Sequence, residues 1–211
     1  MIKFEKNIFG YIEGYYGNIL DWKSRKRIIK KMNSLGLNSY FYAPKEDIYH
    51  RLHWRKNYTK SWQNNFKNFC SFANENNVQV IVGLSPGLDF NYNNILKKDI
   101  ELINKDLEIL LNKFQSLIDN GANHVALLFD DIEVNFRKYL PKKIEGLVHA
   151  ELINIVSDKL KKNIFSVPRI YSDELIRENN EYLKCFFEKL NDQTNIFYCG
   201  KYIVNNKFDT T

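Results

Sequence analysis

Short hydrophobic runs alternate along the chain with longer segments in which apolar residues recur at helical spacing. Each run is short enough for one strand and is bounded by turn-forming residues. The runs predict six strands, at residues 7–13, 39–43, 78–84, 124–129, 164–167 and 195–198. Five of these strands are followed by a segment with helical period, so the pattern predicts a series of strand–helix units.

The segments between the strands predict five helices, at about residues 22–35, 61–73, 100–117, 144–160 and 175–190. Asp21 stands where a side chain can cap the first helix. Gly36 and Gly121 stand after the first and third helices, where a helix end favours left-handed backbone. The residues at these boundaries therefore agree with the helical periods.

Strands that are unbroken hydrophobic runs are typical of parallel sheets covered by helices on both faces. A regular strand–helix repeat then predicts either a doubly wound sheet or a (β/α)8 barrel. A doubly wound nucleotide-binding fold would carry G-x-G-x-x-G or a Walker loop after its first strand. Residues 13–17 instead read Glu-Gly-Tyr-Tyr-Gly, and the bulky tyrosines would keep a phosphate away from the backbone.

Polar residues follow nearly every predicted strand, which is where (β/α)8 barrels build their active sites. These residues are Glu13, Lys45, Glu46, Asp47, Ser85, Asp130, Asp131 and Tyr171. We therefore predict an α/β fold of the (β/α)8 TIM-barrel type. A complete barrel needs about 250 residues, so we expect residues 1–211 to form a single domain that is incomplete at its C-terminal end, with about six of eight units present.

The composition shows that the chain can bury a substantial core. Hydrophobic residues make up 44% of it and aromatic residues 15%, which excludes general disorder. No apolar run reaches the about 18 residues of a membrane span, and the first 17 residues lack the apolar segment of a secretory signal. Three widely spaced cysteines lack zinc or disulfide spacing, which predicts reduced core thiols. We expect a cytoplasmic protein that does not act at a membrane.

The net charge of +6 is concentrated in the first 60 residues, which hold 13 Lys and Arg against 5 Asp and Glu. A basic segment is one feature of nucleic-acid-binding proteins. However, 24 of the 31 cations are lysines, and they punctuate helical patterns as solvent-exposed residues do. Because no arginine-rich stripe with stacking aromatics occurs, we predict no nucleic-acid partner.

The sharpest chemical feature is the pair Asp130 and Asp131, directly after the hydrophobic run at 124–129. Two carboxylates held close together cannot both ionise freely, so the pKa of one should rise. A carboxyl that keeps its proton near neutral pH is what general acid catalysis on a glycosidic oxygen needs. The alternatives are that the pair caps the following turn or binds a metal, although His124 and His149 have no ligand spacing.

Adjacent aspartates lie too close together for the usual glycosidase pair, whose carboxyl groups flank the bond ~5 Å or more apart. The pair fits better if the substrate supplies the nucleophile, as in substrate-assisted glycosidases. In that scheme a 2-acetamido oxygen attacks the anomeric carbon. One aspartate then orients and polarises the acetamido N–H, while its neighbour protonates the leaving oxygen.

Four sequence blocks resemble one family in their order and spacing. They are Gly10-Tyr-Ile-Glu-Gly-Tyr-Tyr-Gly17, Gly36-Leu-Asn-Ser-Tyr-Phe-Tyr-Ala-Pro-Lys-Glu-Asp-Ile-Tyr-His-Arg51, Gly83-Leu-Ser-Pro-Gly-Leu-Asp89 and Ala126-Leu-Leu-Phe-Asp-Asp-Ile132. Together they are similar to the catalytic domain of family 84 glycoside hydrolases, the β-N-acetylglucosaminidases that include protein O-GlcNAcase and bacterial hyaluronidase-like enzymes. The resemblance runs from about Gly10 to Val204. It implies a retaining exo-β-N-acetylglucosaminidase that needs no metal and no cofactor.

The resemblance also implies roles for single residues. Asp130 matches the aspartate that polarises the 2-acetamido group, and Asp131 matches the general acid and base. Gly14 matches a glycine whose carbonyl accepts from a sugar hydroxyl, and Lys45 matches a lysine that hydrogen-bonds the sugar. Tyr171 matches a tyrosine that hydrogen-bonds the acetamido oxygen as the oxazoline forms.

The chain departs from the family pattern in several places. It has Tyr198-Cys199-Gly200 where the family usually has Trp-Thr-Gly, and Pro168-Arg169-Ile170-Tyr171 in place of Pro-Thr-Glu-Tyr. The family's Trp-Asp-Asn and Asn-Asp segments have no counterpart. Tyr16 and Val204 match pocket-lining positions. Part of the sugar-binding wall is therefore missing, while the residues for proton transfer are present.

Two interpretations follow from these matches and departures. The first is an active enzyme whose partner is an N-acetylglucosamine-containing glycan or glycoprotein. The second is a non-catalytic or inactive truncated homologue that binds N-acetylhexosamine weakly. In either case six strands would leave two unpaired sheet edges, which favours self-association through those edges.

Overall fold

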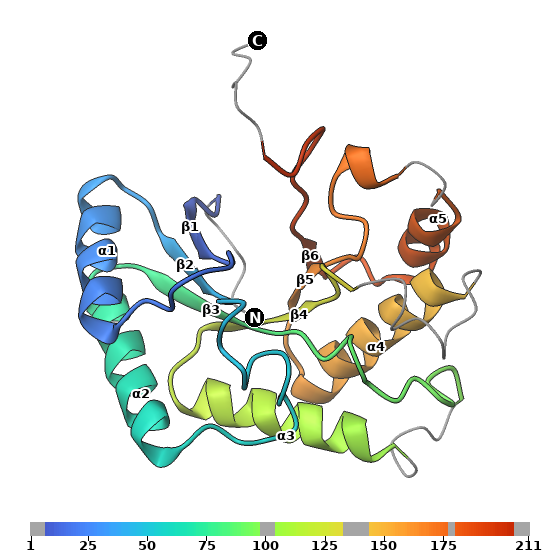
Figure 1. Ribbon diagram of the computed structural model, residues 1–211, viewed down its shortest axis with the longest axis horizontal. Coiled ribbons are helices and arrows are strands. Elements are labelled where there is room, and N and C mark those ends of the chain that lie inside the picture. The colour runs from blue at the N-terminus through green and yellow to red at the C-terminus, as the bar shows by residue number, and fades with distance from the viewer. Residues whose placement is uncertain (1–6, 98–103, 133–143, 177–179, 205–211) are drawn as a thin grey trace. The chain divides into compact units, whose positions relative to one another are not determined.

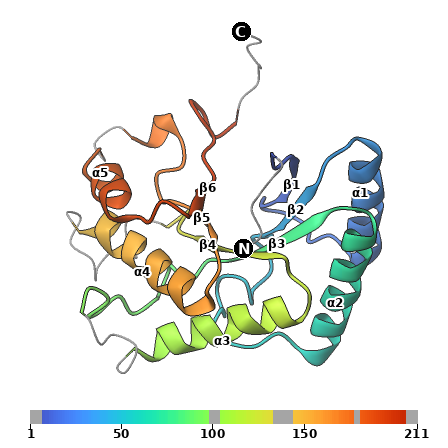
Figure 2. The ribbon, with the colours of Figure 1, turned by 180° about the vertical axis from the view of Figure 1, so that it is seen from behind.

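The computed structural model describes residues 7–97, 104–132, 144–176 and 180–204. The chain divides into two compact units (Figure 1, Figure 2). Unit 1 comprises Met1–Leu84 and Asn112–Val125, and unit 2 comprises Ser85–Leu111 and Ala126–Thr211. Each unit is described here by itself, and the expectation of a single domain over residues 1–211 stays a prediction.

Unit 1 contains three parallel strands and two complete helices. Its elements are β1 (Gly10–Glu13), α1 (Trp22–Ser34), β2 (Ser39–Tyr42), α2 (Lys60–Glu75) and β3 (Gln79–Leu84). β2 pairs with β1 on one side and with β3 on the other. Gly10 lies opposite Ser39, and a Cβ at Gly10 would overlap the Ser39 carbonyl oxygen. The glycine thus permits the close approach of β1 to β2.

The core of unit 1 is an aromatic layer between these strands and the two helices. The Trp62 ring stacks on Phe66 with centroids 4.8 Å apart, and Trp22 meets Trp62 edge to face at 5.7 Å. The Arg25 guanidinium lies 4.6 Å from the centre of the Trp22 ring and 4.9 Å from that of Tyr42. Cation–π contacts therefore help α1 to bury an arginine against β2.

Unit 2 contains the second set of parallel strands. Its further elements are α4 (Glu145–Leu160), β5 (Phe165–Val167), the short 3-10 helix η3 (Asp173–Leu175), α5 (Asn180–Lys189) and β6 (Asn195–Ile196). α3 (Lys105–Asp119) and β4 (His124–Leu128) contribute residues to both units. β5 pairs with β4 and with β6. Helices α4 and α5 pack closely because Gly146 leaves room for the Tyr182 carbonyl, which a Cβ would overlap.

The predicted order of strands and helices is confirmed, with shifts at the boundaries. Asp21 caps α1 by accepting from the Ser24 N–H at 2.6 Å, and Gly36 has a φ of 72°. The first strand begins at Gly10 rather than at residue 7. The second helix begins at Lys60, because Thr59 rather than Ser61 opens it by accepting from the Trp62 N–H at 3.3 Å.

Other boundaries differ where the hydrophobic run continues past the last ladder hydrogen bond. The last strand ends at Ile196 and not at residue 198. The helix predicted at 175–190 is α5, which begins at Asn180, and Leu175 is instead the last residue of η3. Residues 100–103 of the third predicted helix and 177–179 of the fifth lie outside the described residues.

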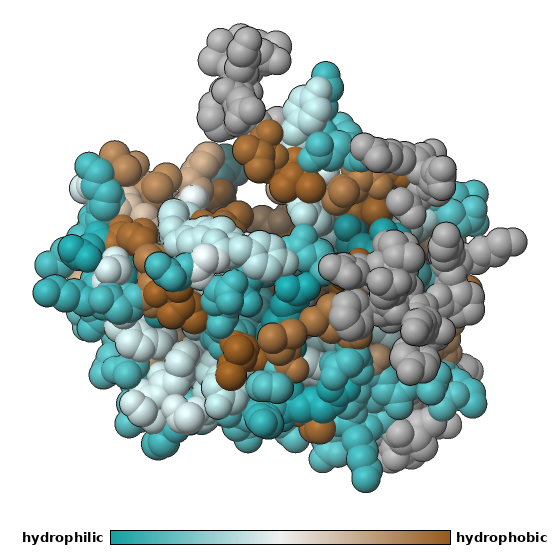
Figure 3. Space-filling model, in the orientation of Figure 1, coloured by the Kyte–Doolittle hydropathy of each residue, from teal (hydrophilic) through white to brown (hydrophobic). Residues whose placement is uncertain are grey.

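Large hydrophobic side chains remain at the surface, where Figure 3 shows brown residues among hydrophilic ones. In unit 1 they gather around β1, as Phe9, Ile12, Tyr15, Tyr16 and Ile19, and in unit 2 they follow β6, as Tyr198, Tyr202, Ile203 and Val204. The prediction of core thiols holds for Cys70 and is wrong for Cys199, which is exposed. Within the described part of the chain, no helix has the length and apolar character needed to cross a bilayer.

Candidate functional site

The two aspartates follow β4 at a sharp turn of the backbone. Phe129, the residue before them, is fully buried, and its N–H still donates to the Val167 carbonyl at 2.9 Å. Asp131 then has a φ of 56°, in the left-handed region that aspartate tolerates better than most residues. The chain therefore leaves the sheet after Phe129, and both aspartates lie in the turn that follows.

Tyr171, four residues after the end of β5, lies directly against this turn. Its hydroxyl donates to Oδ1 of Asp131 at 3.1 Å, and its own carbonyl accepts from the Cys199 N–H at 2.7 Å. Burial, followed by the negative charges of Asp131 and Asp130, raises the pKa of Tyr171 well above the ordinary tyrosine value. Unit 2 thus brings together three of the predicted site residues, with Tyr171 held as a protonated donor beside two carboxyl groups.

Gly14 and Lys45 lie in unit 1, where the segments after β1 and β2 run side by side. The Ala43 N–H donates to the Glu13 carbonyl at 3.0 Å, and the Lys45 N–H donates to the Tyr15 carbonyl at 3.4 Å. Lys45 is only 7% exposed. The five predicted site residues therefore form two groups, Gly14 with Lys45 in unit 1 and the aspartates with Tyr171 in unit 2.

Two buried charged residues, Asp47 after β2 and Lys113 on α3, organise the segment containing Lys45. Asp47 accepts from the hydroxyls of Tyr42 at 2.7 Å and Tyr58 at 3.0 Å. The Lys113 ammonium donates to the backbone carbonyls of residues 49, 54 and 56, at 2.6, 2.8 and 2.7 Å. Burial lowers the pKa of Lys113 to about 8. Sequence reasoning missed Lys113 because the residues that it binds are about sixty positions away.

Glu13, one of the polar residues predicted at the ends of the strands, is held in a buried ion pair. Its side chain is fully buried and accepts from Arg25 Nε at 2.9 Å, from Arg25 Nη2 at 2.8 Å and from the Tyr40 hydroxyl at 2.6 Å. Glu13 thus faces α1, because alternate strand residues point to opposite faces. It stabilises the strand that presents Gly14.

Two further predicted positions lie at the surface. Tyr16 and Val204, which match pocket-lining positions, are 58% and 73% exposed. The Tyr16 hydroxyl accepts from Arg51 at 3.1 Å. In the described ranges no group of three or more His, Cys, Asp and Glu side chains is placed to hold a metal ion. His124 bonds Gln79 at 3.0 Å, and His149 belongs to a buried cluster in unit 2.

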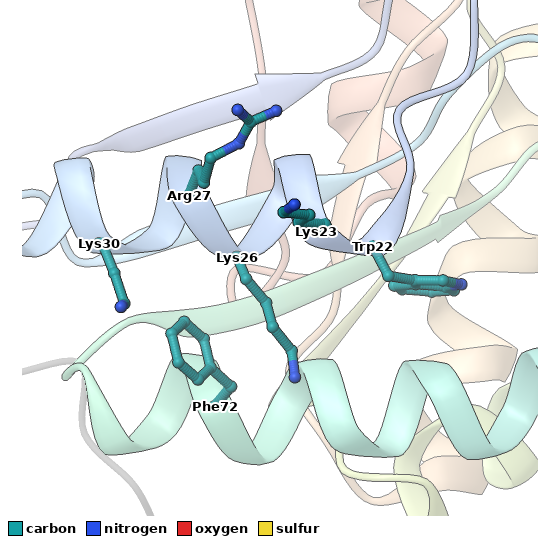
Figure 4. A pocket seen from close by; sticks show the side chains of 6 residues that line it. All are labelled: Trp22, Lys23, Lys26, Arg27, Lys30 and Phe72. Carbon is teal, nitrogen blue, oxygen red and sulfur yellow. The ribbon is translucent and has the colours of Figure 1, made fainter.

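Unit 1 also has a groove on α1 and α2 that the sequence patterns did not predict. Figure 4 shows its lining residues, which are Trp22, Lys23, Lys26, Arg27, Lys30 and Phe72. The ammonium groups of Lys26 and Lys30 lie 5.1 and 5.9 Å from the centre of the Phe72 ring. Part of the positive excess of the first 60 residues therefore lies on this pair of helices. Because no carboxylate lines it, the groove is not a candidate site for glycoside hydrolysis.

Comparison with curated proteins shows two O-GlcNAcases that resemble the chain. Protein O-GlcNAcase of Mus musculus is 27% identical over 206 residues, which are 94% of this chain and 21% of that protein. Protein O-GlcNAcase of Rattus norvegicus is 31% identical over 143 residues, which are 68% of this chain and 15% of that protein. The chain thus spans about a fifth or less of the length of these relatives.

Solved structures share the fold, and a family model matches most of the chain. CpGH84B has a TM-score of 0.80 at 29% identity, over 94% of this chain and 34% of that one. A mutant of the Thermobaculum terrenum O-GlcNAc hydrolase has a TM-score of 0.77 at 24% identity, over 93% and 42% of the two chains. These likenesses confirm the predicted incomplete barrel of α/β type. Since the family model described as beta-N-acetylglucosaminidase matches residues 9–211, the chain belongs to that family of glycoside hydrolases, as its four sequence blocks predicted.

Proposed function

We propose that the chain supplies the proton-transfer residues of a retaining exo-β-N-acetylglucosaminidase in which the 2-acetamido group of the substrate is the nucleophile. The observation that carries this proposal is the hydrogen bond of Tyr171 to Asp131, with Asp130 next to it in the same turn. A phenol donor and two adjacent carboxyl groups are the groups that such a reaction requires. The proposed substrate is an N-acetylglucosamine-containing glycan or glycoprotein.

Each of the three residues has one task in the proposed first step. Asp130 accepts from the acetamido N–H and so increases the electron density on the acetamido oxygen. That oxygen attacks the anomeric carbon as the glycosidic bond breaks, and Asp131 donates its proton to the departing oxygen. Tyr171, now released from Asp131, donates its hydroxyl to the acetamido oxygen while the oxazoline ring forms.

The second step reverses these proton movements. Asp131, now a carboxylate, takes a proton from water, and the water oxygen attacks the anomeric carbon from the side that the aglycone has left. The oxazoline opens and the acetamido group returns with its N–H on Asp130. Two displacements at the same carbon retain the β configuration. No step needs a metal or a cofactor.

The two residues of unit 1 bind rather than react in this proposal. The Gly14 carbonyl accepts from a sugar hydroxyl and the Lys45 ammonium donates to another. The structure supports these roles in two ways. Backbone hydrogen bonds join the segment that carries Gly14 to the segment that carries Lys45, and the Lys45 side chain is almost completely buried. The Gly14 carbonyl and the Lys45 side chain should lose little freedom when a ligand binds, since both are already held by the fold.

Hydrolysis of 4-nitrophenyl N-acetyl-β-glucosaminide tests the assignment of roles. Asp130→Asn should lower kcat because the acetamido group is no longer polarised. Asp131→Asn should lower the rate of hydrolysis more for substrates with poor leaving groups than for the nitrophenyl substrate, because nitrophenolate departs with little help from an acid. Asp158→Asn, at an exposed position of α4, is the matched control and should keep full activity. Hydrolysis that survives the loss of both Asp130 and Asp131 would refute the proposal.

A second function, binding without turnover, is favoured by the segment after β6. Tyr198 occupies the position of a family tryptophan, and its hydroxyl donates to Asp173 at 2.7 Å. Calorimetric titration with an N-acetylglucosamine-derived thiazoline separates the two functions. Micromolar or tighter binding by a chain that releases no nitrophenol would establish the binding function and exclude the enzymatic one.

A further inference from the structure

Both segments that carry the proposed catalytic groups are in contact with one buried polar cluster of unit 2. We define the Tyr182 cluster as Glu145 and His149 of α4, Tyr182 of α5, and Arg169 after β5. All four side chains are buried, with exposed fractions of 1–7%. The residues of this cluster have no role in the reaction steps proposed above. None of the four sequence blocks includes its members on α4 or α5.

On the side of β4, the cluster supports the residue that precedes the two aspartates. The Phe129 ring stacks on the His149 imidazole, with centroids 4.0 Å apart and planes inclined by 9°. Phe129 is fully buried and His149 is 1% exposed. Because Phe129 cannot turn without displacing the imidazole, the position of His149 limits where the turn of Asp130 and Asp131 begins.

On the side of β5, the cluster holds the residue two positions before Tyr171. The Arg169 N–H donates to the Tyr182 hydroxyl at 2.9 Å, and the Arg169 guanidinium lies 4.6 Å from the centre of the Tyr182 ring. Nε of Arg169 is 2.7 Å from Oε1 of Glu145. The backbone and the side chain of Arg169 are therefore both fixed by groups of α4 and α5.

One oxygen atom connects these two sides. The Tyr182 hydroxyl, which accepts from Arg169, also lies 3.2 Å from Nδ1 of His149. Since the phenol oxygen already accepts from a backbone N–H, its own proton can be donated to Nδ1 of the neutral imidazole. Burial alone does not demand this hydroxyl, because Phe186, one turn further along α5, is fully buried without any polar atom.

We propose that Tyr182 is a positioning residue, whose hydroxyl acts through His149 and Arg169 to hold the Asp130–Asp131 turn and Tyr171 at the separation that the reaction needs. The inference rests on the proposed function of those three residues. The contact that we expect to depend on the Tyr182 hydroxyl is the hydrogen bond of 3.1 Å between Tyr171 and Asp131. Loss of the Tyr182 hydroxyl should let the two segments move independently.

Tyr182→Phe, which removes one oxygen atom and keeps the ring, is the test. It should lower kcat about tenfold or more, since small displacements of reacting groups are costly, and leave KM within about twofold because the sugar-binding residues of unit 1 are untouched. The matched control is Ser157→Ala, which removes the hydroxyl that donates to the Lys162 carbonyl at 2.8 Å near the end of α4. This control should leave both constants unchanged.

The ionisation of Tyr171 gives a second readout that needs no turnover. Burial and the charge of Asp131 raise its pKa, so at a pH of about 11, one unit above the ordinary tyrosine value, wild-type Tyr171 should remain protonated. In Tyr182→Phe, where the contact with Asp131 is loosened, the pKa of Tyr171 should fall, so its ionisation should begin at a lower pH than in the wild type, as seen by 13C NMR of the tyrosine ζ carbon. Tyr171→Phe identifies the resonance.

Each result decides the proposal. The proposal is supported if Tyr182→Phe shows a lower kcat and ionisation of Tyr171 at a lower pH, and if Ser157→Ala shows neither change. Unchanged ionisation of Tyr171, or an equal loss of kcat in the control, overturns it. If the wild-type chain shows no turnover, the proposed function fails and Tyr171 ionisation alone decides the positioning role. If Tyr182→Phe does not fold, His149→Phe, which keeps the stacked ring, is judged by the same measurements.

Discussion

The buried ion pair between Glu13 and Arg25 makes a quantitative prediction about the stability of unit 1. Glu13→Gln keeps the shape of the side chain but removes its charge, so Arg25 stays 3% exposed without a counter-ion. Breaking one side of a buried pair costs about 3–5 kcal/mol. The guanidinium keeps its contacts with the rings of Trp22 and Tyr42, which partly offset that cost. We therefore expect a loss of about 3 kcal/mol, the lower end of the range.

Removing both charges should cost less than removing one. In Glu13→Leu with Arg25→Met neither a carboxylate nor a guanidinium is left buried, and replacing a buried pair by hydrophobic residues is often close to neutral. The Tyr40 hydroxyl, which donates to Glu13 at 2.6 Å, would lose its acceptor, so we expect a loss of about 1–2 kcal/mol. The double variant should thus be more stable than Glu13→Gln.

Urea unfolding followed by tryptophan fluorescence measures both free energies, since Trp22 and Trp62 lie in the affected layer. The comparison is valid where the slope of the free energy against urea is the same for all variants. A loss below about 1 kcal/mol for Glu13→Gln would refute this reasoning, and so would a double variant that is less stable than Glu13→Gln. Either result would show that burying Arg25 without its counter-ion is not costly.

Three further predictions follow from buried or edge residues. Burial lowers the pKa of His50 from 6.5 to about 4, so the stabilising contribution of neutral His50 is present above pH 6.5 and is lost as the pH falls toward 4. The loss should be roughly 3 kcal/mol. Urea unfolding at several pH values should show this loss in the wild type and not in His50→Gln. Gly10→Ala should lower stability by about 1–3 kcal/mol through overlap with the Ser39 carbonyl, and an unchanged melting temperature would contradict this. The exposed edge at β1, where Ile12 is 51% exposed, should cause self-association that Ile12→Lys abolishes in light scattering; a wild-type monomer at high concentration would refute it.

The order of the elements and the place of the two aspartates could be predicted from sequence because both depend on local patterns. Hydrophobic periodicity located the six strands and the five α-helices named above but not η3. The rule that polar residues gather after parallel strands pointed to Asp130 and Asp131. Tyr171 followed from the same rule. Its hydrogen bond to Asp131 was a consequence of the topology and not of any spacing along the chain.

What the sequence could not predict depends on contacts between distant residues. The position of Glu13 after a strand suggested a ligand site, but whether it faces α1 is decided by Arg25 and by Tyr40, 27 residues away. Lys113 looked like an ordinary helix lysine, although it binds carbonyls 57 to 64 positions earlier. Single-sequence patterns carry no information on such pairings.

The left-handed backbone at Asp131 has a consequence for how that position can vary. Aspartate and asparagine adopt a φ of 56° more readily than alanine does, so the chain geometry and the acid chemistry restrict the same residue independently. Replacement of Asp131 by alanine would change the turn and remove the acid at once, so the two effects could not be separated. Replacement by asparagine keeps the turn and removes only the acidic proton. A homologue with asparagine here would have lost its acid but not its turn, and one with glycine would have kept the freedom to turn while leaving Tyr171 without an acceptor.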